Sequence, residues 1–488
     1  MQKKEDRQKR WLHHCRSGML FILVFFLGMV FGGILHISFI SRLGEIWNLS
    51  KKGNTSEKYQ EVMRIMSNDW FFAAQIPAVG QRLSDQALTG MTTNAEDAHT
   101  AYMTEEEIQQ FTQSINRNFV GIGVQYRSSD DGLHIITAIM PDSPAEKAGV
   151  QVGDIIHAVD GKVVDALNAQ EIRSLVQGEE GTTVTIDFLR EGKTLTLKLT
   201  RAEVSSTVES NVCQEDIGYL HILQFGNTTA AEVRKALEAF QKQGVNKLLI
   251  DLRDDGGGYL EALQGVVDCF LPKDQVFLVR TYSDGSSTKM KTTGGRIDGI
   301  GPIVLLVNGN TASAAEAFTL AMKEGRKDVT IVGETTYGKG TVQVTKYFDD
   351  GSAIKYTNSK WTSPHGVWIN GTGITPDEEV QLADVLNMPY TVLKEDESYA
   401  LDSVGSPVAQ MQQFLQFLGY DIDRTDGYFD ISTQEALAHF ITERKLDTKE
   451  VLNKKTMDAL IAEVIRRWTG DESVDTQKKR GIEVLHEQ

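Results

Sequence analysis

Two short segments combine glycine with residues that could attack or stabilise a carbonyl group. The first reads Asp-Asp-Gly-Gly-Gly over 254–258 and ends the apolar run KLLIDLR. The second reads Gly-Asn-Thr-Ala-Ser-Ala-Ala-Glu over 309–316 and leads from PIVLLVN into a helical pattern. Glycine lets a backbone N–H approach a substrate, and free N–H groups at a helix N-terminus can stabilise an oxyanion. Ser313 is therefore a candidate nucleophile; the alternative is an ordinary helix N-cap beside a tight turn.

A serine hydroxyl needs a base, and a lysine can act as one when burial lowers its pKa. Lys339 lies between two glycines just after a predicted strand, so its backbone can pack closely against other elements. Alternation in the strand that follows places Gln343 on the same face as Lys339, where its amide could orient the amine. Because most lysines are solvated, this pattern alone does not distinguish a catalytic Lys339 from an ordinary one.

Other catalytic signatures are missing or incomplete. The sequence has no H-E-x-x-H, no Cys/His cluster and no G-x-S-x-G, so it indicates neither a zinc site nor a nucleophile elbow. Residues 333–339 approach a Walker A motif, but Gly340 stands where Ser or Thr would hold magnesium. Ser286 and Lys289 match S-x-x-K without its partner motifs. We expect no metal and no cofactor.

The candidate residues fall in a region, about 203–387, where strands and helices alternate. Apolar strands such as KLLIDLR, PIVLLVN and VTIVGET are separated by amphipathic helices. This pattern predicts an α/β core whose mainly parallel sheet is covered by helices. Both glycine-containing segments then lie at the carboxyl ends of parallel strands, where ligands bind in open α/β sheets.

The rest of the chain divides into segments of different periodicity. Residues 41–117 follow a helical pattern, and residues 118–202 read as short strands separated by Gly, Asp and Pro. After the core, the polar run 388–403 is typical of a linker. Residues 404–470 predict a small helical module, and residues 471–488 are a charged tail.

Charge is distributed unevenly along the 488 residues. The formal net charge is −17, which argues against binding of nucleic acid because phosphate would be repelled. Residues 1–17, however, hold six basic and two acidic residues, and residues 18–40 contain no Asp, Glu, Lys or Arg. As a helix the second segment would be roughly 34 Å long, enough for a bilayer core. We expect a single-pass anchor with a cytoplasmic N-terminus; the alternative is a cleaved signal peptide.

Taken together, the core segments resemble the carboxyl-terminal processing peptidases, also called tail-specific proteases. The similar blocks are DLRDDGGG at 251–258, NTASAAE at 310–316, GETTYGKGTVQ at 333–343 and PHGVWINGTGITPD at 364–377. They correspond to the family's D-L-R-x-N-x-G-G turn, its Ser-Ala-x-Glu motif, its G-E-x-T-x-G-K-G-x-x-Q block and its T-P-x-G…G-I-x-P-D segment. The blocks keep the family's order between about residues 60 and 385, which makes the resemblance specific.

The resemblance implies Ser–Lys acyl transfer on a crotonase-like core. Ser313 matches the nucleophile, Lys339 the general base, and Gln343 the residue that positions the lysine. A peptide carbonyl would be attacked to form an acyl-enzyme, which water then hydrolyses. The oxyanion would be bound by two backbone N–H groups, those of Ala314 and of either Gly256 or Gly257.

Residues 118–202 resemble a PDZ domain. FVGIGV is similar to its carboxylate-binding loop, and SPAEKAGVQVGDIIHAVDGK to its S-P-A-x-x-A-G-x-x-x-G-D-x-I-x-x-x-[ND]-G run. The resemblance implies that the C-terminal tail of a protein substrate adds as a strand. Its carboxylate would be held by the loop, at Gly121, Ile122, Gly123 and Val124. Many relatives have Arg at the position of Gln177, so any coupling through that Arg is absent.

Residues 404–470 contain GSPVAQMQQFLQFLGY, TDGYFDISTQEALAHF and TMDAL, which resemble a peptidoglycan-binding module. A small dimerisation or substrate-docking bundle is the alternative, and Ile441 replaces the Gln usual after the Phe. A membrane anchor combined with a wall-binding module indicates the cell envelope of a Gram-positive bacterium. The partners would be protein substrates, the membrane, peptidoglycan and a second copy of the chain.

The function predicted from these segments is a membrane-anchored, extracytoplasmic serine endopeptidase that recognises C-terminal tails for processing or degradation. The alternative belongs to another class: a catalytically silent scaffold that holds tails with its PDZ domain and the wall with its C-terminal module. The presence of Ser313, Lys339 and Gln343 together favours the enzyme.

Overall fold

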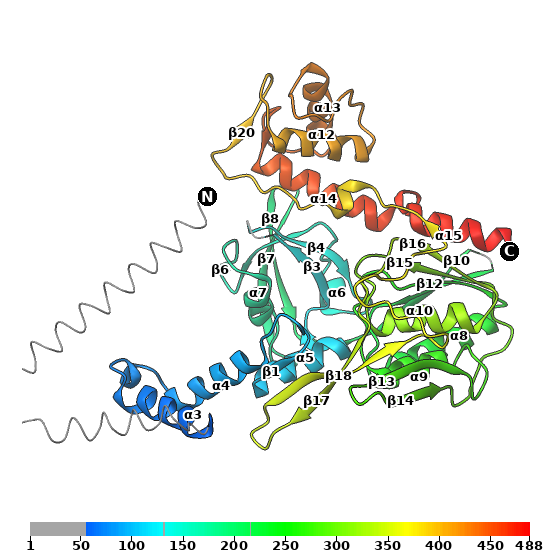
Figure 1. Cartoon of the computed structure of the whole chain (residues 1–488). Coiled ribbons are helices and arrows are strands. Elements are labelled where there is room, and N and C mark those ends of the chain that lie inside the picture. Colours follow the sequence, from blue (N-terminus) through cyan, green and yellow to red (C-terminus); the bar gives the residue numbers. More distant parts are fainter. Residues whose placement is uncertain (1–54, 130–131, 215) are drawn as a thin grey trace, which may run out of the picture. The chain divides into compact units, whose positions relative to one another are not determined.

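The computed structural model of the protein describes three stretches of the chain, residues 55–129, 132–214 and 216–488 (Figure 1). The basic segment expected at 1–17 and the anchor expected at 18–40 lie outside the described residues. Within the described stretches, every helix is too short or too polar to cross a bilayer. The chain forms two compact units, Met1–Thr93 and Asn94–Gln488.

The described part of the first unit is helical. It contains α3 (Thr55–Arg64), a π-helical turn at Ile65–Asp69, a 3-10 turn at Ala73–Gln75 and α4 (Val79–Thr92). Few of its residues are buried, and large apolar side chains such as that of Phe71 are exposed. The amphipathic pattern thus forms helices here without enclosing much of an apolar core.

A six-stranded sheet forms the centre of the second unit. Its strand order is β10-β11-β12-β15-β16-β19, and every neighbouring pair is parallel except β10 with β11. The strands are β10 (Val208–Gln214), β11 (Ile217–Ile222), β12 (Lys247–Asp251), β15 (Ile303–Val307), β16 (Val329–Gly333) and β19 (Glu378–Glu379). Strand β15 is buried along its whole length because both faces of the sheet are covered. This is the α/β core that the sequence pattern predicts.

Helices lie on both faces of this sheet. One face packs against α8 (Thr229–Lys242), α9 (Leu260–Val267) and α10 (Ala314–Gly325) in a single apolar core. The other face packs against Val484 and Leu485 of α15 (Thr476–Glu487). The segment 471–488, expected as a charged tail, thus contains a helix that packs on the sheet. Its few apolar side chains lie between charged residues in sequence but face the sheet once α15 forms.

A second, antiparallel sheet shares the core of the first. Its strands are β1 (Ala101–Met103), β13 (Val276–Tyr282), β14 (Ser287–Lys291), β17 (Thr341–Tyr347) and β18 (Ala353–Thr362). Phe277, Val342 and Trp361 of these strands are buried in the same cluster as α8, α9 and α10. Strand β17 follows directly on the segment that carries Lys339, so this sheet brings additional side chains to the candidate site.

Residues 118–202, expected to resemble a PDZ domain, contain a sheet of order β3-β4-β5-β7-β8, with β6 paired to β5. The strands are β3 (Val124–Ser128), β4 (His134–Ile139), β5 (Ile155–Val159), β6 (Lys162–Val163), β7 (Thr183–Arg190) and β8 (Lys193–Thr200). Helices α6 (Pro144–Lys147) and α7 (Ala169–Val176) enclose a separate core that includes Ile172 and Phe188. The entering strand β2 (Asn118–Gly121) pairs with the leaving strand β9 (Ala202–Ser205), which joins the two ends of the module.

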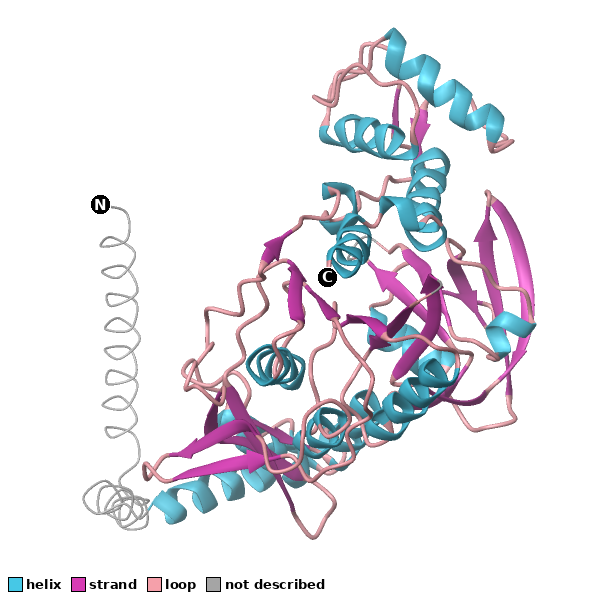
Figure 2. Ribbon diagram, turned by 90° about the vertical axis from the view of Figure 1, so that its right-hand side faces the viewer, coloured by secondary structure: helices cyan, strands magenta, loops and turns pink. Residues whose placement is uncertain are grey.

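The C-terminal module lies at the top of Figures 1 and 2 and is helical. It consists of α12 (Ser406–Leu418), α13 (Ile431–Glu443) and α14 (Lys454–Gly470). Its apolar core also takes in Ile135 and Ile155 from the preceding strand-rich module. The segment 388–403 does not behave as the expected free linker, because Tyr390 and Leu393 are buried in the same core.

Candidate active site

Ser313 lies between β15 and α10, at the N-cap position of the helix. Its φ of 57° and ψ of −113° differ from the extended dihedrals of an ordinary N-cap, and a positive φ is strained for a residue with a side chain. The half-buried residue lines a cavity of about 380 Å³. This turn places the hydroxyl at the cavity wall, where a nucleophile has to be, so a plain N-cap is the less favoured interpretation.

Lys339 lies in the segment between β16 and β17 and lines the same cavity. Burial lowers the pKa of its amine, and the ammonium of Lys355 lowers it further, against the carboxylates of Glu316 and Asp97. Its backbone is held in place, because its carbonyl oxygen accepts a hydrogen bond of 2.9 Å from the indole N–H of Trp361. The structure therefore brings Ser313 and a lysine with a lowered pKa into one cavity.

Glu316, in the first turn of α10, connects the serine segment to the lysine segment. Its buried carboxylate accepts from the backbone N–H of Ser313 at 2.8 Å on one side. On the other side it accepts from the N–H groups of Gly338 at 2.7 Å and Lys339 at 2.8 Å, and from the Thr336 hydroxyl at 2.5 Å. One side chain thus sets the positions of both segments. The sequence motif contained Glu316, but nothing in the pattern indicated this role.

Gln343 also lines the cavity, and its amide nitrogen is bonded to two threonines. Its Nε2 donates to the hydroxyls of Thr341 at 3.0 Å and Thr357 at 2.9 Å. Thr357 in turn donates to a carboxylate oxygen of Asp97 at 3.1 Å. The register of β17 with β18 shifts between Val342 and Gln343, but Gln343 still lines the cavity together with Thr341 and Lys339, as the alternation predicted.

The three candidate oxyanion donors lie together, at the start of α10 and in the turn after β12. Gly257 has a φ of +96°, and a Cβ there would lie 2.7 Å from the nitrogen of Ala314. Its own N–H donates to Oδ1 of Asp255 at 2.8 Å. Gly256 lines the cavity, and within the described chain its N–H donates to no other residue. Of the two glycines, Gly256 has the N–H that is available to a substrate.

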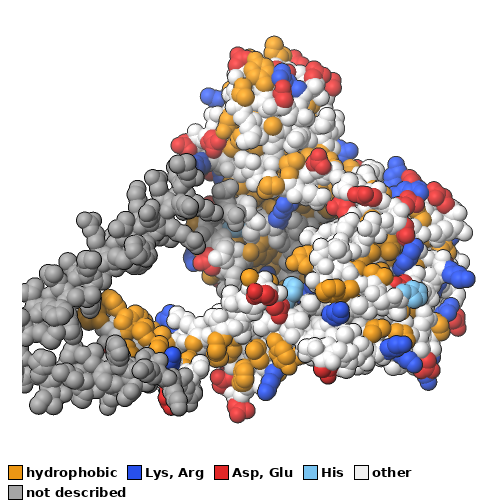
Figure 3. All heavy atoms as spheres, in the orientation of Figure 1, with side chains coloured by type: hydrophobic (Ala, Val, Ile, Leu, Met, Phe, Trp, Pro, Cys, Tyr) orange, Lys and Arg blue, Asp and Glu red, His pale blue; other side chains and the backbone are white. Residues whose placement is uncertain are grey.

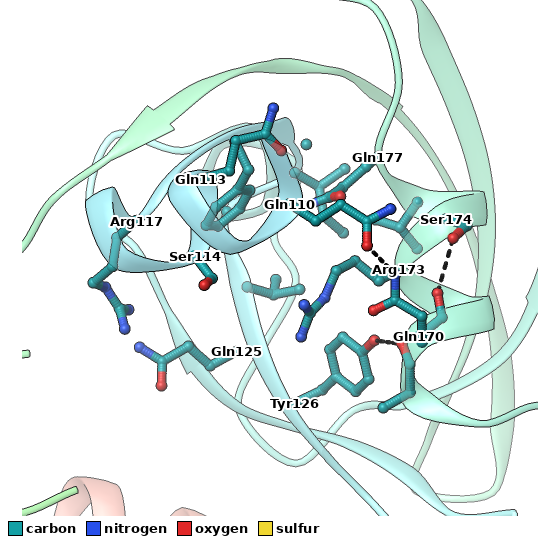
Figure 4. Close-up of a pocket in the computed structure, with 17 residues that line it drawn as sticks. Gln110, Gln113, Ser114, Arg117, Gln125, Tyr126, Gln170, Arg173, Ser174 and Gln177 are labelled. Carbon is teal, nitrogen blue, oxygen red and sulfur yellow. Dashed lines mark hydrogen bonds between the residues drawn. The ribbon is translucent and has the colours of Figure 1, made fainter. Parts of the chain in front are cut away.

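The loop expected to bind a carboxylate lines a second cavity, of about 360 Å³ (Figure 4). The cavity wall includes Gly121, Ile122, Gly123, Val124 and Gln177. In the described part of the chain, the N–H groups of Ile122 and Gly123 donate to no other residue. A Cβ on Gly123, where φ is +77°, would lie 2.3 Å from the Cβ of Ser143, so only glycine fits. The loop thus presents two free donors in one small space.

Two motifs rejected from the sequence lie away from the candidate site or lack the required fold. The Walker-like run ends in strand β17 rather than in a helix, as expected. Ser286 and Lys289 are exposed at the β13–β14 hairpin and do not line the cavity of Ser313. Asp97, Thr357 and Lys355 were not found from the sequence, because they come from segments distant in the chain and carry no motif.

Models of known protein families match three segments of the chain. The model of peptidase family S41 matches residues 216–380, a PDZ domain model matches 135–190, and a putative peptidoglycan binding domain model matches 404–460. The photosystem II D1 C-terminal processing protease, a solved structure, is 28% identical with a TM-score of 0.43, over 64% of this chain and 85% of its own.

Two curated relatives from Bacillus subtilis (strain 168) cover most of the chain. Its carboxy-terminal processing protease CtpA is 34% identical over 406 residues, which are 83% of this chain and 85% of the relative. Its carboxy-terminal processing protease CtpB is 30% identical over 443 residues, 89% of this chain and 90% of the relative. The chain therefore belongs to peptidase family S41, among the carboxy-terminal processing serine proteases.

Proposed function

We propose that the chain is an extracytoplasmic endopeptidase that cleaves proteins by a Ser313–Lys339 dyad after its PDZ domain has bound their C-terminal tails. The observation that supports the dyad best is the bridge made by Glu316, which joins the segments of both residues at one cavity. A carboxylate with donors on both sides holds the relative position of nucleophile and base, and such positioning is a large part of catalysis.

In this mechanism Lys339 acts as the base in its neutral form. Burial and Lys355 lower the pKa of the amine, which increases the neutral fraction near neutral pH. The amine accepts the proton of the Ser313 hydroxyl as its oxygen attacks the peptide carbonyl. The resulting ammonium then protonates the leaving amine of the substrate, and the acyl-enzyme is hydrolysed by a water that Lys339 deprotonates.

Gln343 acts on the lysine through its amide oxygen. Both hydrogen-bonding directions at Thr357 are defined, because its hydroxyl donates to Asp97 and therefore accepts from the Gln343 amide nitrogen. With the nitrogen held by Thr341 and Thr357, the amide oxygen remains to accept a hydrogen bond from the Lys339 amine. The expected positioning role then survives, with two threonines that orient the amide.

The developing oxyanion is bound by the backbone N–H groups of Ala314 and Gly256. Ala314 is the first residue of α10, where N–H groups have no partner within the helix. Gly256 is favoured as the second donor because it lines the cavity and its N–H has no acceptor in the described chain, while the N–H of Gly257 is bonded to Asp255. Both donors belong to the backbone and are fixed before the substrate arrives, which is the arrangement that favours a transition state.

The proposed setting is the cell envelope of a Gram-positive bacterium. The uncharged apolar segment 18–40 would anchor the chain, and its basic flank at 1–17 would keep the N-terminus in the cytoplasm. The match of residues 404–460 supports binding of peptidoglycan by the C-terminal module. Cosedimentation of the full chain with insoluble peptidoglycan tests that binding, and protease accessibility in intact cells tests the orientation.

The dyad is tested with an unstructured protein that ends in an apolar tail. We expect the full chain to cleave it and Ser313→Ala and Lys339→Ala each to abolish cleavage. Ser286→Ala and Lys289→Ala are matched controls, because they remove the same groups from an exposed hairpin. Undiminished cleavage by either dyad variant would refute the assignment. Tail binding by the unmodified chain without any cleavage would instead favour a silent scaffold.

A further inference from the structure

The tail-binding cavity of the PDZ domain has a third wall that narrows it. Besides strand β3 and helix α7, the cavity is lined by α5 (Glu105–Asn116), as Figure 4 shows. The Gln170 amide of α7 donates to Gln110 of α5 at 3.2 Å, which joins two of the walls. The Tyr126 hydroxyl of β3 donates to the backbone oxygen of Ala169 at 2.8 Å. These two contacts connect α7 to α5 and to β3.

The charge inside the cavity is positive. Two of the lining residues are arginines, Arg117 and Arg173, and none of the described residues that line it is acidic. On the face of the molecule drawn in Figure 3, basic and acidic side chains are interspersed. The excess of positive charge at this cavity is therefore a local feature and does not follow from the net charge of −17, which has the opposite sign.

Arg173 is the arginine with a guanidinium available to a ligand. It forms no ion pair with any carboxylate of the described chain, and its side chain lies beside the Tyr126 ring in Figure 4. Arg117 is more constrained, because its Nε donates to the backbone oxygen of Ser206 at 3.1 Å and Glu209 lies close enough to offset its charge. A planar guanidinium that contacts the Tyr126 hydroxyl but no carboxylate matches the two oxygens of a carboxylate.

The position of Arg173 along the groove determines which tail residue it meets. A carboxylate bound by the free N–H groups of Ile122 and Gly123 places the last side chain against the apolar atoms of Ile122, Val124 and Val176. Each residue of an added strand advances about 3.3 Å, so the third residue from the end lies about 6.6 Å farther along. Tyr126 lies two positions along β3 from Val124, and the side chain of Arg173 lies beside the Tyr126 ring.

We propose that this PDZ domain selects tails with an acidic residue third from the carboxyl terminus and an apolar residue at the end, and that Arg173 reads the acidic side chain. The proposal builds on the tail recognition proposed above and names the class of substrate. A cation without a carboxylate partner in this cavity attracts an anionic side chain and repels a cationic one. The apolar wall of the cavity separately favours an apolar residue at the last position of the tail.

The test compares tails that differ in one residue. Fluorescent twelve-residue peptides ending in Glu-Ala-Val, Gln-Ala-Val or Lys-Ala-Val are titrated with the full chain carrying Ser313→Ala, which prevents cleavage. We expect the Glu peptide to bind about tenfold more tightly than the Gln peptide, and the Lys peptide to bind most weakly. The preference should decrease with added salt, because the contact is electrostatic and near the surface.

Variants of Arg173 show whether this residue causes the preference. Arg173→Gln should make the Glu and Gln peptides bind equally, and Arg173→Glu should reverse the order so that the Lys peptide binds best. The matched control is Lys162→Gln, which removes the same charge from the exposed strand β6 outside the cavity, and it should leave the preference intact.

Two results would overturn the proposal, and they differ in what they say about tail recognition. If all three peptides bind equally to the unmodified cavity, the acidic preference is wrong while tail recognition stands. If none of the three binds, the tail recognition on which the proposal depends is wrong as well. If the Arg173→Gln variant still binds the Glu peptide more tightly than the Gln peptide, a residue other than Arg173 causes the preference, and the role proposed for Arg173 is wrong.

Discussion

At the scale of single residues, Glu316 links two segments that are otherwise separate. Its carboxylate accepts from backbone N–H groups of both the Ser313 and the Lys339 segments, and a glutamine in its place would present two N–H groups to the same donors. We expect Glu316→Gln to lower kcat on the order of 10²-fold, because the nucleophile and base lose their alignment. It should also reduce the free energy of unfolding by about 3 kcal/mol.

Steady-state cleavage and chemical denaturation measure the two effects of Glu316→Gln. Glu238→Gln, an exposed change on α8, is the control and should alter neither. Peptide binding to the PDZ cavity should be unchanged in both variants. A Glu316→Gln enzyme with normal kcat would mean that the two segments are positioned by other contacts.

The pH dependence of cleavage should report on Lys339 and its neighbour Lys355. Lysine must be neutral to act as a base, so activity rises with pH as the amine loses its proton. Lys355 is one cause of the lowered pKa of Lys339, because a second positive charge disfavours the ammonium. Lys355→Gln should therefore raise the pKa of Lys339 and move the acidic limb of the kcat/KM profile to higher pH.

The control for this profile is Lys346→Gln, which removes a lysine from an exposed position of β17. It should leave the acidic limb where it is in the unmodified enzyme. A shift of the limb to lower pH in Lys355→Gln, or no shift at all, would contradict the proposed electrostatic role of Lys355.

Asp255 is a buried carboxyl beside the oxyanion turn. Its Oδ1 accepts from Gly257, but its Oδ2 has no partner in the described chain. Burial raises the pKa of Asp255 well above its ordinary value, against the Gly257 N–H and the charges of His221 and Arg117. A carboxyl with a raised pKa contributes its stability at low pH and loses it as the pH rises through the raised value.

Asp255→Asn should therefore stabilise the protein at pH 8 and have little effect near pH 4. The amide oxygen can still accept from Gly257, so the turn should keep its shape and the enzyme its activity. Thermal unfolding at several pH values measures the difference, with the exposed Asp349→Asn as control. A variant less stable than the unmodified protein at pH 8 would show that the carboxylate is ionised and usefully bonded.

Residue types and spacing made Ser313 and the glycine turn candidates, because each follows a strand of the parallel sheet, and the family resemblance added Lys339 to the same site. The contacts of Gln343 could not be predicted in the same way. They depend on Thr357 and Asp97, which are brought to the site by the pairing of β17 with β18 and by tertiary contacts. A strand pattern specifies a face of the sheet and not the partner across it.

At the scale of elements, the alternating pattern predicted the parallel sheet well because its central strands β12, β15 and β16 are mostly apolar and buried. The pattern did not reveal which elements cover the second face. Helix α15 covers it with only a few apolar side chains, among them Val484 and Leu485, within a charged sequence. A short amphipathic segment at the end of a chain looks the same in sequence whether it docks or not.

The docking of α15 predicts a stability effect at a single position. Leu485 is fully buried against the sheet, so Leu485→Ala should reduce the free energy of unfolding by about 2–5 kcal/mol. Lys479→Ala on the exposed side of the same helix should change it by about 0.5 kcal/mol or less. Urea denaturation of both variants makes the comparison. Equal stability of the two would mean that α15 does not cover the sheet in solution.

At the scale of the whole molecule, the C-terminal segment is connected to the catalytic core by charge as well as by packing. The guanidinium of Arg253 is buried and pairs with Asp251 at 2.6 Å and with Asp475 at 2.8 Å. Arg253 lies just before the turn that carries Asp255 and Gly256. The segment after the peptidoglycan-binding match thus contacts the residue that precedes the proposed oxyanion turn, 222 residues earlier in the chain.

Asp475→Ala should therefore impair catalysis, although Asp475 lies far from Ser313 and Lys339 in the sequence. Removing one partner of a buried ion pair typically costs about 3–5 kcal/mol, and here the charge left without its second partner is next to the oxyanion turn. We expect a lower kcat with unchanged binding of tail peptides. Truncation of the chain after residue 470 should lower kcat by at least as much. Glu472→Ala, an exposed neighbouring change, is the control. Full activity of the shortened chain would mean that the protease core is complete without this segment, and that the tail serves stability alone.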